Sequence, residues 1–197
     1  MRTIEYFFAT VSPYTYLAGT RLEAVAAKHG AAIEYRPLDI MALFARTGGT
    51  PPKDRHPNRQ AWRLQELRRQ ARKLGMPMNL RPAHWPTNPA PSSYAIIAAK
   101  EAGGDVGALA HAFTRACWAE ERDVADDAVI RDVLAANGFD PGLADSGLLS
   151  GAEAYARNLE DAVAKGAFGA PFYLVGEERF WGQDRIGDVD LFLAGEL

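Results

Sequence analysis

Residues 3–18 read TIEYFFATVSPYTYLA, and this stretch decides the fold. Residues 3–10 are rich in β-branched and aromatic side chains, which favours a buried strand. Ser12 followed by Pro13 is typical of a helix start, with the serine as N-cap and the proline at the first helical position. Apolar residues then recur at helical spacing through residues 14–28. We therefore predict a strand and one helix that meet at Ser12.

The segments that follow complete two short α/β units. Residues 32–38 form a second strand in the pattern, and a short crossover between strands implies that the two run parallel. Near the end of the chain, residues 171–175 and 179–181 flank a glycine turn and predict a hairpin. A last helix is expected over residues 186–194. The chain thus opens as β-α-β and ends as β-β-α.

Between these units lies a long segment with almost no strand signal. Helices are expected in five stretches, namely residues 61–74, 91–102, 106–121, 126–137 and 151–165. Residues 82–91 contain four prolines and predict an irregular but specified segment. We therefore predict an α/β fold in which residues 1–40 plus 166–197 form one domain and residues 41–165 form an all-helical insertion.

Composition favours a packed globule in the cytoplasm. The 197 residues are 48% hydrophobic and carry a formal net charge of −3, so nothing in the charge favours a nucleic acid as partner. No apolar run approaches the length of a membrane span, and the N-terminus starts directly in strand-like alternation without a signal-peptide pattern. Basic residues cluster at 55–59 and 63–73, where an anionic ligand would be attracted.

A single cysteine limits the chemistry. Cys117 lies in an apolar, helix-like stretch and is expected to be a buried structural thiol. One cysteine excludes an intramolecular disulfide and a CxxC redox pair, so a disulfide oxidoreductase is excluded. The four histidines show no metal-ligand spacing, and no metal site is predicted.

Three junctions are candidates for chemistry. Ser12 would lie at a helix N-terminus, which favours an anion and lets the hydroxyl donate a hydrogen bond to a thiolate. A cis bond before Pro171 would leave the backbone of Ala170 free to pair with a peptide-like ligand. Asp184, at the start of the last helix, could meet an ammonium group. Each junction also has a plainer explanation, namely a helix cap, a trans proline and a second helix cap.

Together the junctions fit a known family. Five blocks carry the resemblance: FFATVSPYTYLA at residues 7–18, GGTPP at 48–52, PTN at 86–88, GAFGAP at 166–171 and FWGQDR at 180–185. In this order they resemble the 2-hydroxychromene-2-carboxylate isomerases, relatives of the kappa-class glutathione transferases in the DsbA-like branch of the thioredoxin fold. The resemblance spans nearly the whole chain.

The resemblance implies a role for several residues. Ser12 would activate the glutathione sulfur, and the backbone of Ala170, before Pro171, would pair with the cysteinyl part of glutathione. Gln183 and Asp184 would hold the γ-glutamyl end, and Arg59 is the nearest match to a ligand-binding lysine. Asn88 would lie near the organic substrate, whose carboxylate would meet Asn88, Arg59 or His84.

Two departures from the family pattern stand out. The family often has an asparagine that touches glutathione where this chain has Gly49. Arg59 replaces a lysine, and a guanidinium is not equivalent to an ammonium group.

The resemblance implies a glutathione-dependent isomerase that acts on 2-hydroxychromene-2-carboxylate-type intermediates of aromatic degradation. The products would be of the trans-o-hydroxybenzylidenepyruvate type, and the enzyme would be a homodimer. Two alternatives remain open. One is a kappa-like glutathione transferase or thiol-dependent peroxidase, and the other is a cysteine-free thioredoxin-fold binding module.

Overall fold

Strand β1 (Thr3–Phe8) lies inside a four-stranded mixed sheet of order β2-β1-β3-β4. In the computed structural model, which describes residues 2–197, β1 pairs in parallel with β2 (Ala32–Pro37) and antiparallel with β3 (Phe172–Val175). The hairpin to β4 (Glu178–Trp181) completes the sheet. Both predicted units, β-α-β and β-β-α, are therefore confirmed.

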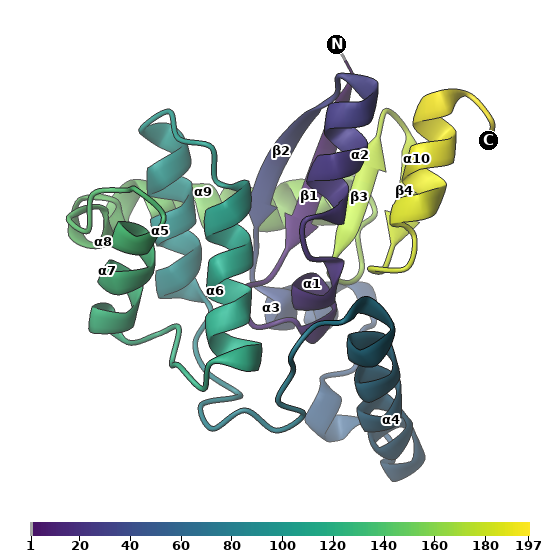
Figure 1. Cartoon of the computed structure of the whole chain (residues 1–197), viewed down its shortest axis with the longest axis horizontal. Coiled ribbons are helices and arrows are strands. Elements are labelled where there is room, and N and C mark those ends of the chain that lie inside the picture. Colours follow the sequence, from purple (N-terminus) through teal and green to yellow (C-terminus); the bar gives the residue numbers. More distant parts are fainter. Residues whose placement is uncertain (1) are drawn as a thin grey trace.

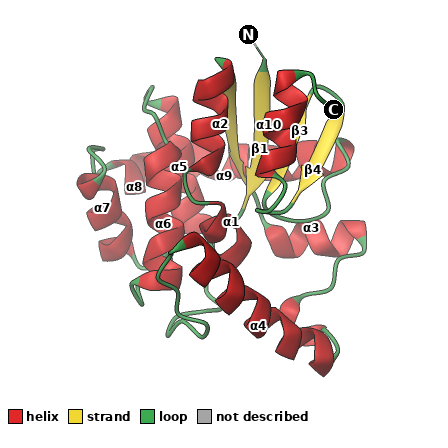
Figure 2. Ribbon diagram, turned by 45° about the vertical axis from the view of Figure 1, so that its right-hand side comes forward, coloured by secondary structure: helices red, strands yellow, loops and turns green. Residues whose placement is uncertain are grey.

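Helices cover both faces of this sheet (Figure 1). Helices α2 (Arg21–His29) and α10 (Ile186–Ala194) lie on one face, and α3 (Ile40–Thr47) and α9 (Leu148–Ala164) lie behind the other. The remaining elements are α1 (Pro13–Ala18), a 3₁₀ turn (Pro52–Asp54), α4 (Pro57–Leu74), α5 (Ala90–Glu101), α6 (Gly107–Ala119), α7 (Asp127–Ala136) and α8 (Leu143–Ser146). Figure 2 shows α4 beyond α1, at the end of the sheet where β1 stops.

The helix predicted over residues 14–28 is in fact two helices. It breaks at Gly19, whose φ of 59° and ψ of −138° are open to glycine and strained for other residues. The apolar periodicity continues across the break and concealed it. Helices α3 and α8 were also not predicted, because each is short.

Alternation along β1 divides the core into two layers. Ile4, Tyr6 and Phe8 face the larger cluster, which includes the apolar sides of α2, α6 and α10. Phe7 faces the opposite way, toward a smaller cluster to which α3 and α9 contribute Leu43 and Ala162. The helical segment 41–165 thus supplies part of the cover of the sheet. We keep the division into residues 1–40 plus 166–197 and residues 41–165 as a proposal about how the chain is built.

Among residues 2–197, no helix combines the length and the apolar character that crossing a membrane requires.

Candidate functional site

Ser12 lies at the N-terminus of α1 and is 92% buried, with 8% of its surface exposed. Its Oγ accepts a hydrogen bond from the backbone N–H of Thr15 at 3.3 Å, so the predicted N-cap is confirmed. The same hydroxyl donates to the backbone carbonyl of Ala170 at a long 3.4 Å. That second bond joins two segments that are far apart in the sequence. A long bond is weak, so the hydroxyl proton can turn to a better acceptor.

The peptide bond between Ala170 and Pro171 is cis, as predicted. Within residues 2–197, neither the N–H nor the C=O of Ala170 makes a backbone hydrogen bond, and Ser12 is the only side-chain partner of the carbonyl. A short stretch of free backbone therefore lies directly beside the Ser12 hydroxyl. Such a stretch can pair with an extended peptide in the manner of an added strand.

Gln183 is held from within the protein. The residue is 4% exposed, and its side-chain oxygen accepts a hydrogen bond from Nη2 of Arg21 at 2.7 Å. Its backbone carbonyl accepts from the same nitrogen at 2.9 Å. Just before it, the N–H of Gly182 donates to the carbonyl of Pro171 at 3.0 Å. The turn that carries Gln183 is thereby fixed both to α2 and to the cis-proline segment. Its role toward a ligand stays a prediction.

Asp184 does not cap the last helix. Helix α10 begins at Ile186 after Arg185, and no side chain caps it. The carboxylate of Asp184 is 55% exposed, and Nη2 of Arg185, 3.1 Å away, is its ion-pair partner. Asp184 also lies close enough to Tyr14 to act on that phenol, whose pKa is raised mainly by burial. Asp184 is thus an exposed acid near the start of α1, and capping does not explain it.

Two indole rings fix the loop that precedes Ser12. Nε1 of Trp85 and Nε1 of Trp118 donate to the carbonyl of Val11, at 3.1 and 3.3 Å. The proline-rich segment is anchored a second time, where Oγ1 of Thr87 donates to Asp123 at 2.6 Å. The segment is therefore irregular and specified, as predicted, and it packs against the Ser12 loop.

The other predicted ligand residues lie at the surface. Arg59 is exposed on the first turn of α4, beside Arg55. His84 is exposed near Asp123, and Asn88 is exposed with its Oδ1 accepting from the N–H of Ala90 at 3.0 Å. In the described part of the chain, no hydrogen bond joins Arg59, His84 or Asn88 to Ser12 or Ala170.

The departure at Gly49 has a structural counterpart. A Cβ at this position would lie 2.3 Å from Cδ1 of Phe44, so a side chain here requires the ring to move. The guanidinium of Arg55 lies over the same ring, 5.9 Å from its centroid, and its Nε donates to the carbonyl of Thr50 at 2.8 Å. Phe44 and Arg55 thus line the place where the family asparagine is expected.

Sequence reasoning placed Arg63 in a basic cluster but did not predict that it is buried beside the Ser12 loop. This arginine is 8% exposed, and its guanidinium lies over the rings of Trp85 and Trp118, at 5.2 and 5.9 Å from their centroids. A signal was present, because residue 63 is four before Leu67 and eight before Ala71, both of which are buried on the same helix face. An arginine on the apolar face of a helix is unusual, and it indicates a position with a special role.

Cys117 is buried, as predicted, with 1% of its surface exposed. Burial, together with Asp123 and Glu121, raises the pKa of its thiol to about 12. A thiol that is neither ionised nor accessible is unreactive.

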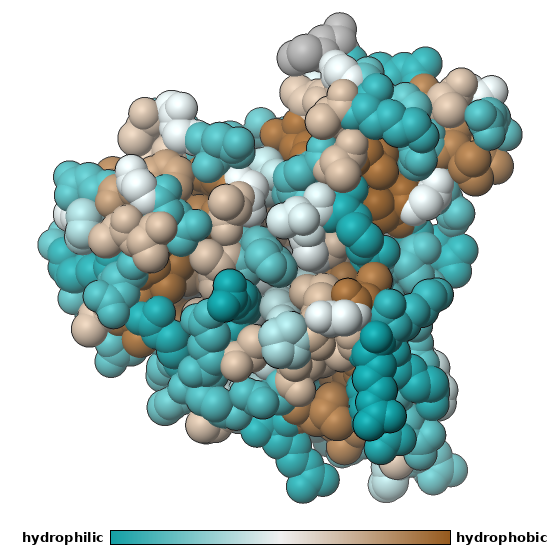
Figure 3. All heavy atoms as spheres, in the orientation of Figure 1, coloured by the Kyte–Doolittle hydropathy of each residue, from teal (hydrophilic) through white to brown (hydrophobic). Residues whose placement is uncertain are grey.

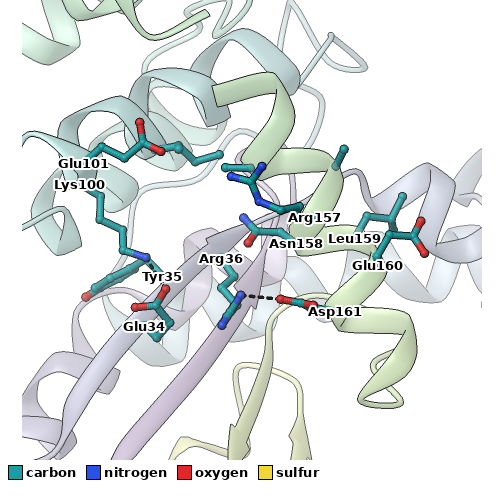
Figure 4. A pocket seen from close by; sticks show the side chains of 13 residues that line it. Glu34, Tyr35, Arg36, Lys100, Glu101, Arg157, Asn158, Leu159, Glu160 and Asp161 are labelled. Carbon is teal, nitrogen blue, oxygen red and sulfur yellow. Dashed lines mark hydrogen bonds and ion pairs between the residues drawn. The ribbon is translucent and has the colours of Figure 1, made fainter. Parts of the chain in front are cut away.

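A cavity lies on another part of the protein. It measures about 590 Å³ and is bounded by β2, α5 and α9 (Figure 4). Most of its charged side chains are neutralised within the protein, for example Arg36 by Asp161 at 2.9 Å and Lys100 by Glu34. Ser12 and Ala170 do not line this cavity, so it is separate from the Ser12 junction.

Comparisons with known proteins identify the fold family of this chain. A sequence model of the DSBA-like thioredoxin domain matches residues 3–194. A 2-hydroxychromene-2-carboxylate isomerase from Sphingobium xenophagum is 29% identical over 98% of each chain. The solved structure of a 2-hydroxychromene-2-carboxylate isomerase superposes with a TM-score of 0.77 at 24% identity, over 98% of this chain and 95% of that one.

A second solved structure shares the fold. The cytosolic disulfide reductase DsbM from Pseudomonas aeruginosa, determined with GSH, superposes with a TM-score of 0.70 at 20% identity over 98% of both chains. At this identity it shows a shared fold. The DsbA-like fold and the resemblance to the isomerases are thereby confirmed.

Proposed function

Since this chain belongs to the family of DSBA-like thioredoxin domains, we propose that its Ser12 junction binds glutathione and uses the thiol for isomerisation. The observation that carries the proposal is the 3.4 Å bond between the Ser12 hydroxyl and the carbonyl of Ala170. It places a hydroxyl donor, a helix N-terminus and a free stretch of backbone at one point. Relatives named as isomerases support an enzyme of this kind.

The residues at the junction fit glutathione. The N–H and C=O of Ala170, which make no backbone hydrogen bond within residues 2–197, match the N–H and C=O of a cysteinyl residue lying antiparallel to it. That pairing would place the cysteinyl sulfur at Ser12. The exposed carboxylate of Asp184 is available to the γ-glutamyl ammonium group. A structure of similar fold, that of DsbM, was determined with GSH, and this supports glutathione as the thiol we propose.

Ser12 and α1 together are sufficient to ionise the thiol. A free thiol has a pKa near ~8.5, and lowering it by about two units requires about 2.7 kcal/mol of differential stabilisation. A charge-assisted hydrogen bond from Ser12 contributes about 1.5–3 kcal/mol. Helix α1 has only six residues, so its N-terminus stabilises the thiolate by at most the ~2 kcal/mol of a favourable helix end. Neither contribution alone is comfortably enough, and we assign the larger share to the hydroxyl.

The reaction we propose is addition and elimination. The thiolate forms a bond to a conjugated carbon of the ring-opened 2-hydroxychromene-2-carboxylate, which turns the adjacent double bond into a single bond. Rotation about that bond and loss of the thiolate then give the trans-o-hydroxybenzylidenepyruvate-type product. The thiol is regenerated, so no oxidant or reductant is consumed. The partners we propose are this small aromatic substrate and a second copy of the chain, in the cytoplasm.

Isothermal titration of glutathione into the purified chain tests the proposal. We expect binding at millimolar or lower concentration, and we expect it to weaken in Asp184→Ala because the ammonium group loses its partner. If no heat of binding is detected at millimolar glutathione, the site does not take this thiol. A thioredoxin-fold binding module without redox cysteines would then be the better interpretation. Activity assays with glutathione distinguish the alternatives. Turnover of the chromene carboxylate indicates an isomerase, and turnover of other electrophiles or of peroxides indicates a kappa-like transferase or a peroxidase.

A further inference from the structure

Arg63 is a buried cation without a counter-ion. The residue is 8% exposed, and no hydrogen bond or ion pair involves its guanidinium within residues 2–197. Its Nη2 is fully buried and has no hydrogen-bond partner. The nearest acid on its helix, Glu66, instead binds Arg69 at 2.7 Å and Gln70 at 2.6 Å. Within residues 2–197, the faces of two indole rings lie against the guanidinium, and nearby Tyr14 also favours its charged form.

This arrangement is costly for the folded protein. An arginine stays charged, and a buried charge normally requires a partner and satisfied hydrogen bonds. Cation–π contacts offset only part of this cost, and they leave the N–H groups at the edge of the guanidinium unused. Burial lowers the pKa of Arg63, and the neighbouring Arg55 lowers it further. The positive charge of Arg55 adds to that of Arg63, so binding of an anion here would be more favourable.

The location connects Arg63 to the Ser12 junction. Trp85 and Trp118, over which it stacks, are the two residues whose indole N–H groups hold the carbonyl of Val11, next to Ser12. Tyr14, two residues after Ser12, is close enough to Arg63 for each to act on the other's charge. Figure 3 shows strongly hydrophilic side chains along α4, the helix that carries Arg63.

We propose that Arg63 forms a carboxylate-binding subsite next to the Ser12 junction. The planar guanidinium edge suits the two oxygens of a carboxylate, and the flanking indole rings suit an aromatic body attached to it. The carboxylate of an aromatic 2-oxo acid is the ligand that this combination fits. The inference rests on the proposed function only for the identity of that ligand. A glutathione carboxylate is the other source of the same chemistry.

Binding measured without turnover tests the subsite. The probes are trans-o-hydroxybenzylidenepyruvate, its methyl ester, which lacks the charge, and glutathione, each titrated separately. The variants are Arg63→Met, which keeps bulk and loses charge, and Arg63→Lys, which keeps charge and loses the planar edge. Arg68→Met is the matched control, because Arg68 is an exposed arginine on the same helix.

We expect the wild type to prefer the acid to the ester, and Arg63→Met to weaken binding of the acid by about 10- to 100-fold, as for a charged hydrogen bond. Arg63→Lys should lose part of the affinity for the acid. The affinity for the ester should be the same in Arg63→Met as in the wild type, and Arg68→Met should bind the acid as the wild type does. A melting temperature of Arg63→Met equal to or above that of the wild type also supports the proposal, because a purely structural arginine would lower it on removal.

The two sources give different results. Loss confined to the aromatic acid assigns the subsite to the substrate, and loss confined to glutathione assigns it to the thiol. The subsite is overturned if Arg63→Met binds both the aromatic acid and glutathione as tightly as the wild type does. It is also overturned if Arg68→Met loses as much affinity as Arg63→Met. If the chain proves not to be an isomerase, Arg63-dependent binding of the acid still supports the subsite, so the two failures are distinguishable.

Discussion

Replacing Ser12 by alanine should raise the pKa of the bound thiol. The substitution removes the hydroxyl that now bonds Ala170 at 3.4 Å, and with it the donor for the thiolate. Loss of a charge-assisted bond of about 1.5–3 kcal/mol raises the thiol pKa by about 1.1–2.2 units. If the wild-type complex titrates near ~6.5, turnover at pH 7 then falls roughly 4- to 40-fold from loss of thiolate alone. Above pH ~9 the thiol ionises without help, so the two rates should converge.

The assay is a pH titration of protein saturated with glutathione, followed by the ultraviolet absorbance of the thiolate and by the rate of isomerisation. Ser12→Thr keeps a hydroxyl at the same position and should retain most of the effect. Identical thiol titration curves for wild type and Ser12→Ala would show that Ser12 does not lower the thiol pKa, even if the rate of isomerisation changed.

Ser12→Ala also removes a helix cap, and that effect must be separated. The bond from the Thr15 N–H is 3.3 Å long, so we expect a stability loss near the lower end of the range for caps, about 0.5–1 kcal/mol, or roughly 1–4 °C in melting temperature. Asp126→Ala is the matched control, because Asp126 caps α7 by accepting from two backbone N–H groups, far from the junction. It should lower stability without moving the thiol pKa.

Three further outcomes are expected. Asp184→Asn should weaken glutathione binding by about three- to tenfold in calorimetry, because an exposed ion pair is lost, while Asp188→Asn should not; equal effects would contradict a specific contact. Gln183→Leu should lower the free energy of unfolding by about 1–2 kcal/mol, because Arg21 loses an acceptor. An unchanged denaturation midpoint in that variant would contradict the anchoring role. Native Cys117 should resist a thiol-alkylating reagent at pH 8, since its pKa is near 12 and it is buried; labelling faster than global unfolding would show an accessible thiol.

The sheet could be predicted because its signals are local. Ser12 and Pro13 mark a helix start whatever the rest of the chain does, and β1 and β3 are short runs bounded by turn residues. The break at Gly19 could not be predicted, because apolar spacing continues through it. A glycine inside a helical pattern is compatible with either outcome, and packing against the rest of the protein decides between them.

The site could be predicted only where topology determines it. Parallel pairing of β1 with β2 and the return of the chain through β3 bring Ser12 and Ala170 together, so the pattern of elements sufficed. The partners of Gln183 and Arg63 depend on tertiary packing. Arg21 occupies the oxygen of Gln183 from another helix, and two tryptophans cover Arg63. Composition alone assigns an arginine to the surface.

The most direct test of the account is the isomerisation of 2-hydroxychromene-2-carboxylate by the purified chain, followed spectroscopically with and without glutathione. Turnover should require the thiol and should fall in Ser12→Ala at pH 7. Turnover at the same rate without glutathione, or with Ser12→Ala fully active at that pH, would contradict the claim that Ser12 activates a bound thiol.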